Sequence, residues 1–190
     1  MNQNDSPLQE IEVIGAGGLA RDFYSCFRNE INITGFWDDG VAQGTLLNNI
    51  PVKGSVAELL TNHNPVNVII MIANPLVRKQ VAEKLKQTNH YTPTLIHSLA
   101  QIFDKNTVHI EKGCIVFPQT VITCNSRISE FSLIHIGCSI HHDSKIGKHC
   151  VLMPGARMTG NSQTGDDVYI GPNLTITNAM KIGNGERVEK

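Results

Sequence analysis

The chain of 190 residues has no apolar run long enough to span a membrane and no cluster of lysine and arginine. A membrane-spanning helix needs about 20 mostly apolar residues, so we expect no membrane partner. The net charge is only −1, and without a basic patch nucleic acid is not an expected partner either. Met1 to Glu10 lack the basic and then apolar segments of a signal peptide, which favours a cytoplasmic location.

Cysteine is scarce and odd in number, with five residues in the chain. Disulfides are not expected in the cytoplasm, where thiols stay reduced. Three of the five, Cys114, Cys138 and Cys150, recur at a spacing that they share with alanine and serine. We therefore expect these three thiols to serve as small packing groups.

From residue 110 onward an apolar side chain returns at every sixth position. The series runs Ile110, Val116, Ile122, Ile128, Ile134, Ile140, Ile146, Leu152, Met158, Thr164, Ile170, Ile176, Ile182 and Val188, and only Thr164 interrupts it. Helices repeat at 3.6 residues and strands at 2, whereas a period of six is typical of one short strand plus one corner of a parallel β-helix. Because three hexads close one triangular coil, we predict between four and five coils, preceded by an irregular first coil at residues 102–107.

The first half of the chain has a different pattern, in which strands alternate with helices. We predict strands at 11–14, 33–37 and 66–72, and helices after Ala20 to about Arg28, at 56–60 and from Pro75 onward. This alternation is typical of βαβ units in a small parallel sheet. The expected fold is therefore a Rossmann-like α/β domain over residues 1–95, followed by a β-helix over residues 96–190.

A glycine-rich turn joins the first predicted strand to the first predicted helix. Gly15, Gly17 and Gly18 allow the backbone to approach a phosphate, and the helix N-terminus supplies N–H donors. Asp38 follows at a distance where an acidic residue holds a ribose hydroxyl in dinucleotide sites. Since about 95 residues make only one mononucleotide half, a nucleotide or nucleotide-linked sugar fits better than NAD. The alternative is a tight turn without a ligand.

The two halves together resemble a bacterial sugar acetyltransferase family. This family contains N-acetyltransferases of nucleotide-linked 4-amino sugars and O-acetyltransferases of sialic acid. The resemblance is carried by residues 13–21, 35–39, 140–147, 152–156 and 160–161. It implies a left-handed β-helix, a homotrimer with the active site between subunits, acetyl-CoA as co-substrate, a nucleotide-sugar acceptor on the first domain, and no metal.

The same resemblance assigns roles to individual residues. The catalytic histidine falls on His142, where a neutral imidazole can accept a proton from the attacking amine or hydroxyl. Asp143 can orient this imidazole only if the pair lies at a corner or if the aspartate comes from a neighbouring subunit, since consecutive strand residues point to opposite faces. The expected acceptor-binding residues are Gly15, Gly17, Gly18, Asp38, Asp39, Asn74 and Arg78, and the expected acetyl-CoA-binding residues are Val151, Gly160 and Gly171.

Two positions depart from the family pattern, and two other functions stay open. Leu19 and Val151 stand where family members often carry histidine. These changes leave a non-catalytic trimer that binds nucleotide sugars as an alternative. A zinc enzyme of the γ-type carbonic anhydrase class is the other, since the β-helix is rich in histidine. Apart from His142, we expect the histidines of this region to lie at the surface or in an interface; they are His135, His141 and His149.

Overall fold

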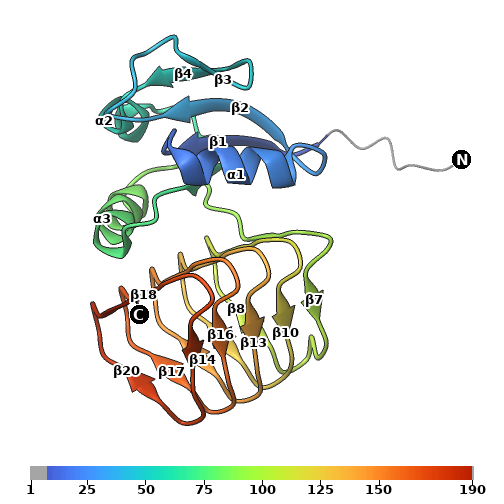
Figure 1. Ribbon diagram of the computed structural model, residues 1–190. Coiled ribbons are helices and arrows are strands. Elements are labelled where there is room, and N and C mark those ends of the chain that lie inside the picture. Colours follow the sequence, from blue (N-terminus) through green and yellow to red (C-terminus); the bar gives the residue numbers. More distant parts are fainter. Residues whose placement is uncertain (1–7, 190) are drawn as a thin grey trace, which may run out of the picture.

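The computed structural model describes residues 8–189, which form a small sheet domain seated on a β-helix (Figure 1). The elements of the sheet domain are β1 (Glu10–Ile14), α1 (Gly18–Phe27), β2 (Asn32–Trp37), β3 (Leu46–Leu47), β4 (Ile50–Gly54), α2 (Val56–Thr61), β5 (Val68–Ile70) and α3 (Pro75–Leu85). None of the three helices in these residues has the length and apolarity that a bilayer crossing requires.

The sheet of the first domain has the strand order β3-β4-β2-β1-β5. Strands β4, β2, β1 and β5 run parallel, as the alternation of strands and helices predicts. The hairpin of β3 and β4 was not predicted. Its turn consists of Asn48 and Asn49, both with positive φ (49° and 66°), the conformation of a type I′ turn. A pair of asparagines is thus the sequence signal for this hairpin.

The β-helix is built from strands of two residues each. They are β6 (Leu95–Ile96), β7 (Gln101–Ile102), β8 (His109–Ile110), β9 (Ile115–Val116), β10 (Val121–Ile122), β11 (Arg127–Ile128), β12 (Leu133–Ile134), β13 (Ser139–Ile140), β14 (Lys145–Ile146), β15 (Val151–Leu152), β16 (Arg157–Met158), β17 (Gln163–Thr164), β18 (Tyr169–Ile170), β19 (Thr175–Ile176), β20 (Lys181–Ile182) and β21 (Arg187–Val188). Every third strand pairs in parallel, which confirms the hexapeptide β-helix. The strands from β8 to β21 make between four and five coils, as predicted, and β6 and β7 belong to the irregular coil that precedes them.

The three faces of this prism are named here by their strands. The six-stranded face contains β6, β9, β12, β15, β18 and β21; the β7 face contains β7, β10, β13, β16 and β19; the β8 face contains β8, β11, β14, β17 and β20. Val121 pairs with Ser139, eighteen residues on, whereas Gln101 pairs with Val121, twenty residues on. The first coil therefore contains two additional residues, which makes it irregular as expected.

The interior of the prism is filled by the hexad side chains. Ile122, Ile128 and Ile134 are completely buried, and the small-residue position holds Cys114, Cys138 and Cys150 as buried free thiols. Thr164, the exception in the series, is also buried. Its hydroxyl accepts the Gly147 N–H at 3.1 Å, so this polar side chain has a partner within the core.

Each corner of the prism contains one residue in the left-handed region. These residues recur every six positions with φ between 49° and 71°: Gly113, Gln119, Asn125, Phe131, Gly137, Asp143, His149, Gly155, Asn161, Asp167, Asn173, Ala179 and Gly185. Most are glycine, asparagine or aspartate, the types that adopt this conformation at low cost. A third series with a period of six, set by backbone geometry, therefore accompanies the series of large apolar residues and the series of small residues.

The sheet domain packs on the six-stranded face, and α1 supplies one side of the contact. Phe23 and Phe27 of α1 are buried and meet Phe117, with ring centroids 6.2 and 5.5 Å apart, respectively. Phe117 in turn stacks on His135 at 4.4 Å. Aromatic pairs at these distances add to the stabilisation that burial gives, so this cluster fixes α1 on the β-helix.

Helix α3 supplies the other side of the contact, at the next corner of the prism. Arg78 is completely buried, and its guanidinium donates to the carbonyl oxygens of Phe131 and of Ile70, the latter at 2.6 Å. Lys79 forms an ion pair with Asp167 at 2.6 Å. Because Phe131 belongs to the β-helix and Ile70 to the sheet, Arg78 joins the two parts of the chain.

Candidate active site

His142 and Asp143 lie together at the corner between β13 and β14. Asp143 adopts a φ of 60°, and its N–H donates to the Cys124 carbonyl of the previous coil at 3.3 Å. This corner turns both side chains to the same side, so that His142 Nδ1 lies 2.9 Å from Asp143 Oδ2. The side chains are 55% and 46% exposed. The corner thus meets the geometric condition under which Asp143 can orient the imidazole within one subunit.

Gly160 lies one coil further along the same column and forms the support of the His142 ring. A Cβ atom on Gly160 would lie only 2.4 Å from Nε2 and Cε1 of His142. The next residue, Asn161, donates its N–H to the His142 carbonyl at 3.0 Å. Gly160, expected to contact acetyl-CoA, therefore also sets the position of the imidazole.

If His142 is the general base that the resemblance implies, replacing Gly160 by Ala should displace its ring and lower kcat about 10- to 100-fold, because small misplacements of a reacting group are costly. The free energy of unfolding should change little, since φ at this glycine is outside the left-handed region. Steady-state kinetics and thermal unfolding measure the two effects. Asn178→Ala, an exposed position one coil beyond Gly160, is the matched control and should keep wild-type kcat. Unchanged kcat in Gly160→Ala would show that the ring does not depend on this contact.

The glycine-rich turn after β1 forms a second group of predicted site residues. A Cβ atom on Gly15, where φ is 102°, would lie 2.6 Å from the Met71 carbonyl oxygen, so only glycine fits there. Gly17 is the N-cap of α1 and makes no side-chain cap, and no atom lies within 4 Å of a Cβ built on it. Gly17 and Gly18 are exposed. The N-terminus of α1 is therefore unobstructed at Gly17, as an anion site requires.

Asp38 supports this turn through the backbone, whereas Asp39 supports the start of α2. Asp38 accepts the Ala16 N–H at 2.7 Å and the Gly40 N–H at 2.8 Å. Asp39 accepts the Val56 N–H at the start of α2, at 2.9 Å. The carboxylate of Asp38 therefore lies at the glycine turn and fixes the shape of that turn.

Two further predicted acceptor residues have other partners. Asn74 is exposed, and its side-chain oxygen caps α3 by accepting the N–H groups of Leu76 (3.0 Å) and Val77 (3.3 Å). The expectation that Arg78 contacts the acceptor is corrected by the structure, because this side chain is completely buried and bonded to backbone carbonyls. Burial lowers the pKa of Arg78 to about 10, which leaves the guanidinium charged at neutral pH.

Two predicted acetyl-CoA residues are likewise buried inside the chain. Val151 has no exposed surface and packs among the apolar residues between the six-stranded face and the sheet domain. Gly171 is also buried, and its N–H donates to the Val188 carbonyl at 2.7 Å. Val151 therefore presents no side chain to a surface groove, and the expectation for this residue is corrected. The N–H of Gly171 already has a partner within the chain.

The other histidines of the β-helix divide into buried and exposed ones. His141 is exposed, whereas His135 and His149 are buried where the sheet domain meets the β-helix. Burial lowers the pKa of His135. Burial also lowers the pKa of His149, although Asp167 at 3.0 Å opposes this shift. In residues 8–189, no three or more His, Cys, Asp or Glu side chains are grouped so that they could hold a metal ion.

The structure brings the predicted residues together in two groups on different sides of the prism. The glycine turn belongs to the sheet domain, which covers the six-stranded face and contacts both corners beside it. His142 lies at the third corner, between the β7 and β8 faces. Figure 1 shows the sheet domain on one side of the β-helix only. Within one chain, the two groups therefore face different regions of solvent.

A β-helix of hexapeptide repeats with an exposed histidine–aspartate pair at a corner is the arrangement that the resemblance to sugar acetyltransferases implies. The model of the PglD N-terminal domain family matches residues 10–85. A GDP-perosamine N-acetyltransferase of Escherichia coli O157:H7 is 25% identical over 170 residues, which cover 86% of this chain and 76% of that protein.

Two solved structures share the whole architecture. The acetyltransferase domain of PglB from Neisseria gonorrhoeae FA1090 superposes with a TM-score of 0.83 at 24% identity, covering 94% of this chain and 87% of that domain. A mutant perosamine N-acetyltransferase from Caulobacter crescentus, in complex with CoA and GDP-perosamine, superposes with a TM-score of 0.77 at 21% identity, covering 94% and 88%, respectively. In sequence and architecture the chain is therefore similar to bacterial acetyl-CoA-dependent sugar acetyltransferases.

Proposed function

We propose that this protein transfers an acetyl group from acetyl-CoA to the amino group of a nucleotide-linked 4-amino sugar. The observation that carries the proposal is the exposed His142–Asp143 pair supported by Gly160. The similarity to the Escherichia coli enzyme, whose name specifies GDP-perosamine as its acceptor, supports the nucleotide-sugar class of acceptor. The Caulobacter crescentus complex with CoA and GDP-perosamine supports acetyl-CoA as donor.

In this proposal His142 is the general base. With Asp143 accepting the Nδ1 proton at 2.9 Å, Nε2 carries the free lone pair that takes a proton from the attacking amine. The amine nitrogen bonds to the thioester carbonyl carbon, the C–S bond breaks, and the proton passes from His142 to the departing thiolate. Holding both substrates at one corner makes the reaction effectively intramolecular, which contributes a large part of the acceleration.

We further propose that residues 1–95 bind the acceptor and residues 96–190 bind acetyl-CoA, in a homotrimer located in the cytoplasm. Gly17 and Gly18, with Asp38 behind them, would hold the phosphates at the N-terminus of α1. Because His142 lies at the corner opposite the face covered by the sheet domain, a second subunit is needed to bring an acceptor to it. A three-fold ring would do so three times.

The proposed activity is tested by mixing the full-length protein with acetyl-CoA and a panel of GDP-, UDP- and dTDP-linked 4-amino sugars. We expect release of free thiol with one or more acceptors, and a product heavier by one acetyl group in mass spectrometry. The matched reaction contains the corresponding 4-hydroxy sugar and should release no thiol. If no acceptor supports thiol release and acetyl-CoA does not bind, the proposal fails.

A further inference from the structure

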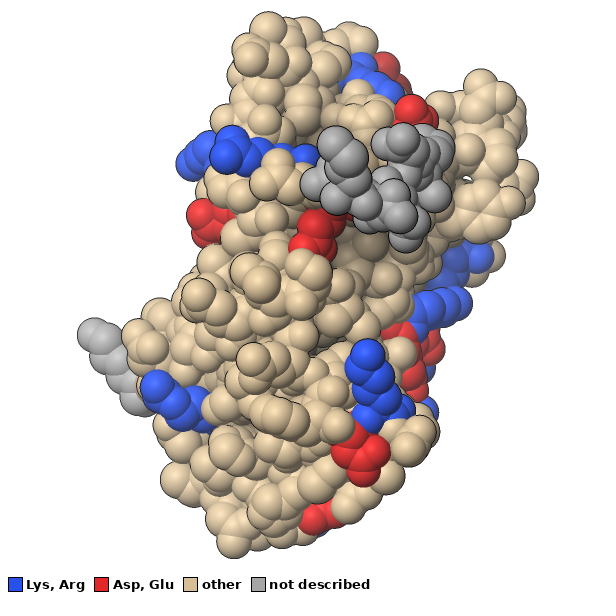
Figure 2. All heavy atoms as spheres, turned by 90° about the vertical axis from the view of Figure 1, so that its right-hand side faces the viewer, with Lys and Arg blue, Asp and Glu red and all other residues tan. Residues whose placement is uncertain are grey.

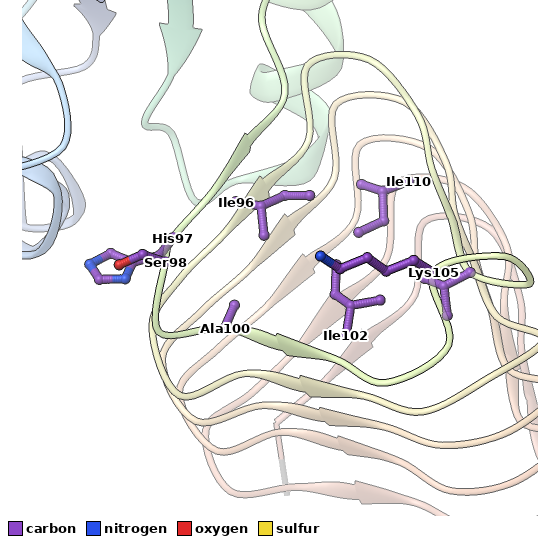
Figure 3. A pocket seen from close by; sticks show the side chains of 8 residues that line it. Ile96, His97, Ser98, Ala100, Ile102, Lys105 and Ile110 are labelled. Carbon is purple, nitrogen blue, oxygen red and sulfur yellow. The ribbon is translucent and has the colours of Figure 1, made fainter. Parts of the chain in front are cut away.

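The first coil leaves the apolar interior of the β-helix open at one end. Ile96, Ile102 and Ile110 occupy the inward positions of this coil, and no further coil covers them among the described residues. They line a cavity of about 540 Å³ together with Ala100 and Val108 (Figure 3). Ile96 is 41% exposed, whereas its counterparts deeper in the prism are fully buried. Cavities of roughly this volume hold small-molecule ligands in proteins.

A fixed loop holds one lysine at the mouth of this cavity. The two additional residues of the first coil lie between β7 and β8, where Asp104 organises the turn. Its carboxylate accepts the Asn106 N–H at 3.1 Å and the Thr107 hydroxyl at 2.8 Å, and its carbonyl accepts the Val108 N–H at 3.1 Å. Lys105 extends from this turn across the opening, with its ammonium above the isoleucines (Figure 3).

Lys105 is the charged side chain that lines the cavity. Within residues 8–189 its ammonium forms no ion pair. The polar groups of the opposite wall are already bonded: His97 Nε2 lies 3.0 Å from the Cys26 carbonyl, and the Ser98 hydroxyl donates to Glu30. An unpaired cation above an apolar floor is complementary to an anion with a hydrocarbon tail.

The charge around this end of the molecule is not a general positive field. Figure 2, which views the molecule from this side, shows acidic and basic side chains interspersed on a mostly uncharged surface. Anions are therefore not attracted here by a cluster of basic groups, and the contact with Lys105 must supply the preference for charge.

We propose that this cavity binds a small carboxylate with an unbranched hydrocarbon tail of medium length. The carboxylate pairs with Lys105, and the tail lies against Ile96, Ile102 and Ile110 in place of the missing coil. The site is separate from His142, which lies further along the prism at the corner of β13 and β14. Its occupancy is therefore measured without reference to acetyl transfer.

Methyl NMR of the full-length protein, labelled at isoleucine, tests the proposal with sodium octanoate as the probe. We expect saturable shifts confined to Ile96, Ile102 and Ile110. Lys105→Met should lower the affinity for octanoate about three- to fivefold, the effect of losing a solvent-accessible ion pair. Octanol lacks the carboxylate, so its affinity for the wild type should be as low as the affinity of octanoate for Lys105→Met. The matched control Lys112→Met, which removes an exposed lysine outside the cavity, should bind octanoate as the wild type does.

A second variant fills the cavity instead of changing its charge. Ala100→Leu adds apolar volume to the lining, so octanoate shifts should disappear while the melting temperature stays the same or rises. Shifts spread over isoleucines throughout the β-helix, or equal affinity in Lys105→Met, would overturn the proposal. Methyl chemical shifts of these isoleucines that change with protein concentration in the absence of octanoate would also overturn the proposal. A second copy of the chain would then cover this end.

Discussion

Replacing His142 by Ala is expected to lower kcat for acetyl transfer by about 10²- to 10⁴-fold, the usual contribution of a general base. The side chain is 55% exposed, so its removal should leave the melting temperature and the assembly unchanged. Thiol release under saturating acetyl-CoA measures kcat. Thermal unfolding measures the melting temperature, and sedimentation measures the assembly. A large loss of rate with an intact assembly is the result that assigns the base.

His141 provides the matched control for this experiment. It is the adjacent residue and is also exposed, and no hydrogen bond or ion pair joins its side chain to another described residue. His141→Ala should therefore keep wild-type kcat. If both variants lose the same fraction of activity, the change reflects the corner as a whole, and His142 is not the base. If neither loses activity, the reaction takes place elsewhere on the protein.

The His142→Ala variant also tests whether the active site forms between subunits. Gly17→Leu places a side chain in the open space before α1 and should block the acceptor without touching His142. When Gly17→Leu and His142→Ala are co-expressed in equal amounts, about a quarter of the sites in a three-fold ring combine two intact halves. Recovery of about that fraction of activity is expected. Mixed assemblies as inactive as the separate variants would place the whole site within one chain.

Replacing Arg78 by Met is expected to reduce the free energy of unfolding by about 3–5 kcal/mol, because each buried acceptor left without its donor costs about 1–3 kcal/mol. Methionine retains most of the apolar stem, but the carbonyl oxygens of Phe131 and Ile70 lose their donor. Since these two residues belong to different parts of the chain, the contact between sheet domain and β-helix should weaken most. Denaturant unfolding with linear extrapolation measures the change.

Lys84→Met is the control for the loss of a positive charge from α3. Lys84 is exposed in the last turn of the same helix, so its replacement should change the free energy of unfolding by less than about 0.5 kcal/mol. An Arg78→Met variant as stable as Lys84→Met would contradict the role of the guanidinium as a link. Two separate unfolding transitions in Arg78→Met would support that role strongly.

The β-helix could be predicted in detail because the six-residue period of the sequence corresponds to one strand and one corner of the coil. Each coil repeats the same inward positions, so Ile122 and Ile140 must stack wherever the series is regular. The six-residue period does not include the first coil, because its two additional residues place Gln101 and Ile102 out of phase with Ile110. The hairpin at Asn48 and Asn49 is short, with a two-residue strand, and it interrupts the alternation that identifies the parallel sheet.

The site residues were predicted unevenly, for reasons that lie in the same geometry. Asp143 could have been placed at a corner by the series of Gly, Asn and Asp that begins at Gly113, three residues after Ile110. Val151 lies nine residues after His142, which is half a coil, so it falls on the six-stranded face beneath the sheet domain. Arg78 looks like a solvated helix residue in the sequence, because the carbonyl oxygens that pair with it come from distant segments.

The two additional residues of the first coil also bear on fibre formation. The last strand of each face at either end of a β-helix has free N–H and C=O groups, on which another chain could continue the ladder without limit. Strands β7 and β8 keep the regular register with β10 and β11, so the two additional residues leave the plane of the strands as a loop. Lys105 extends from this loop across the open end, in the place that an incoming coil would occupy (Figure 3). The irregular coil thus gives the protein an end that does not template its own growth.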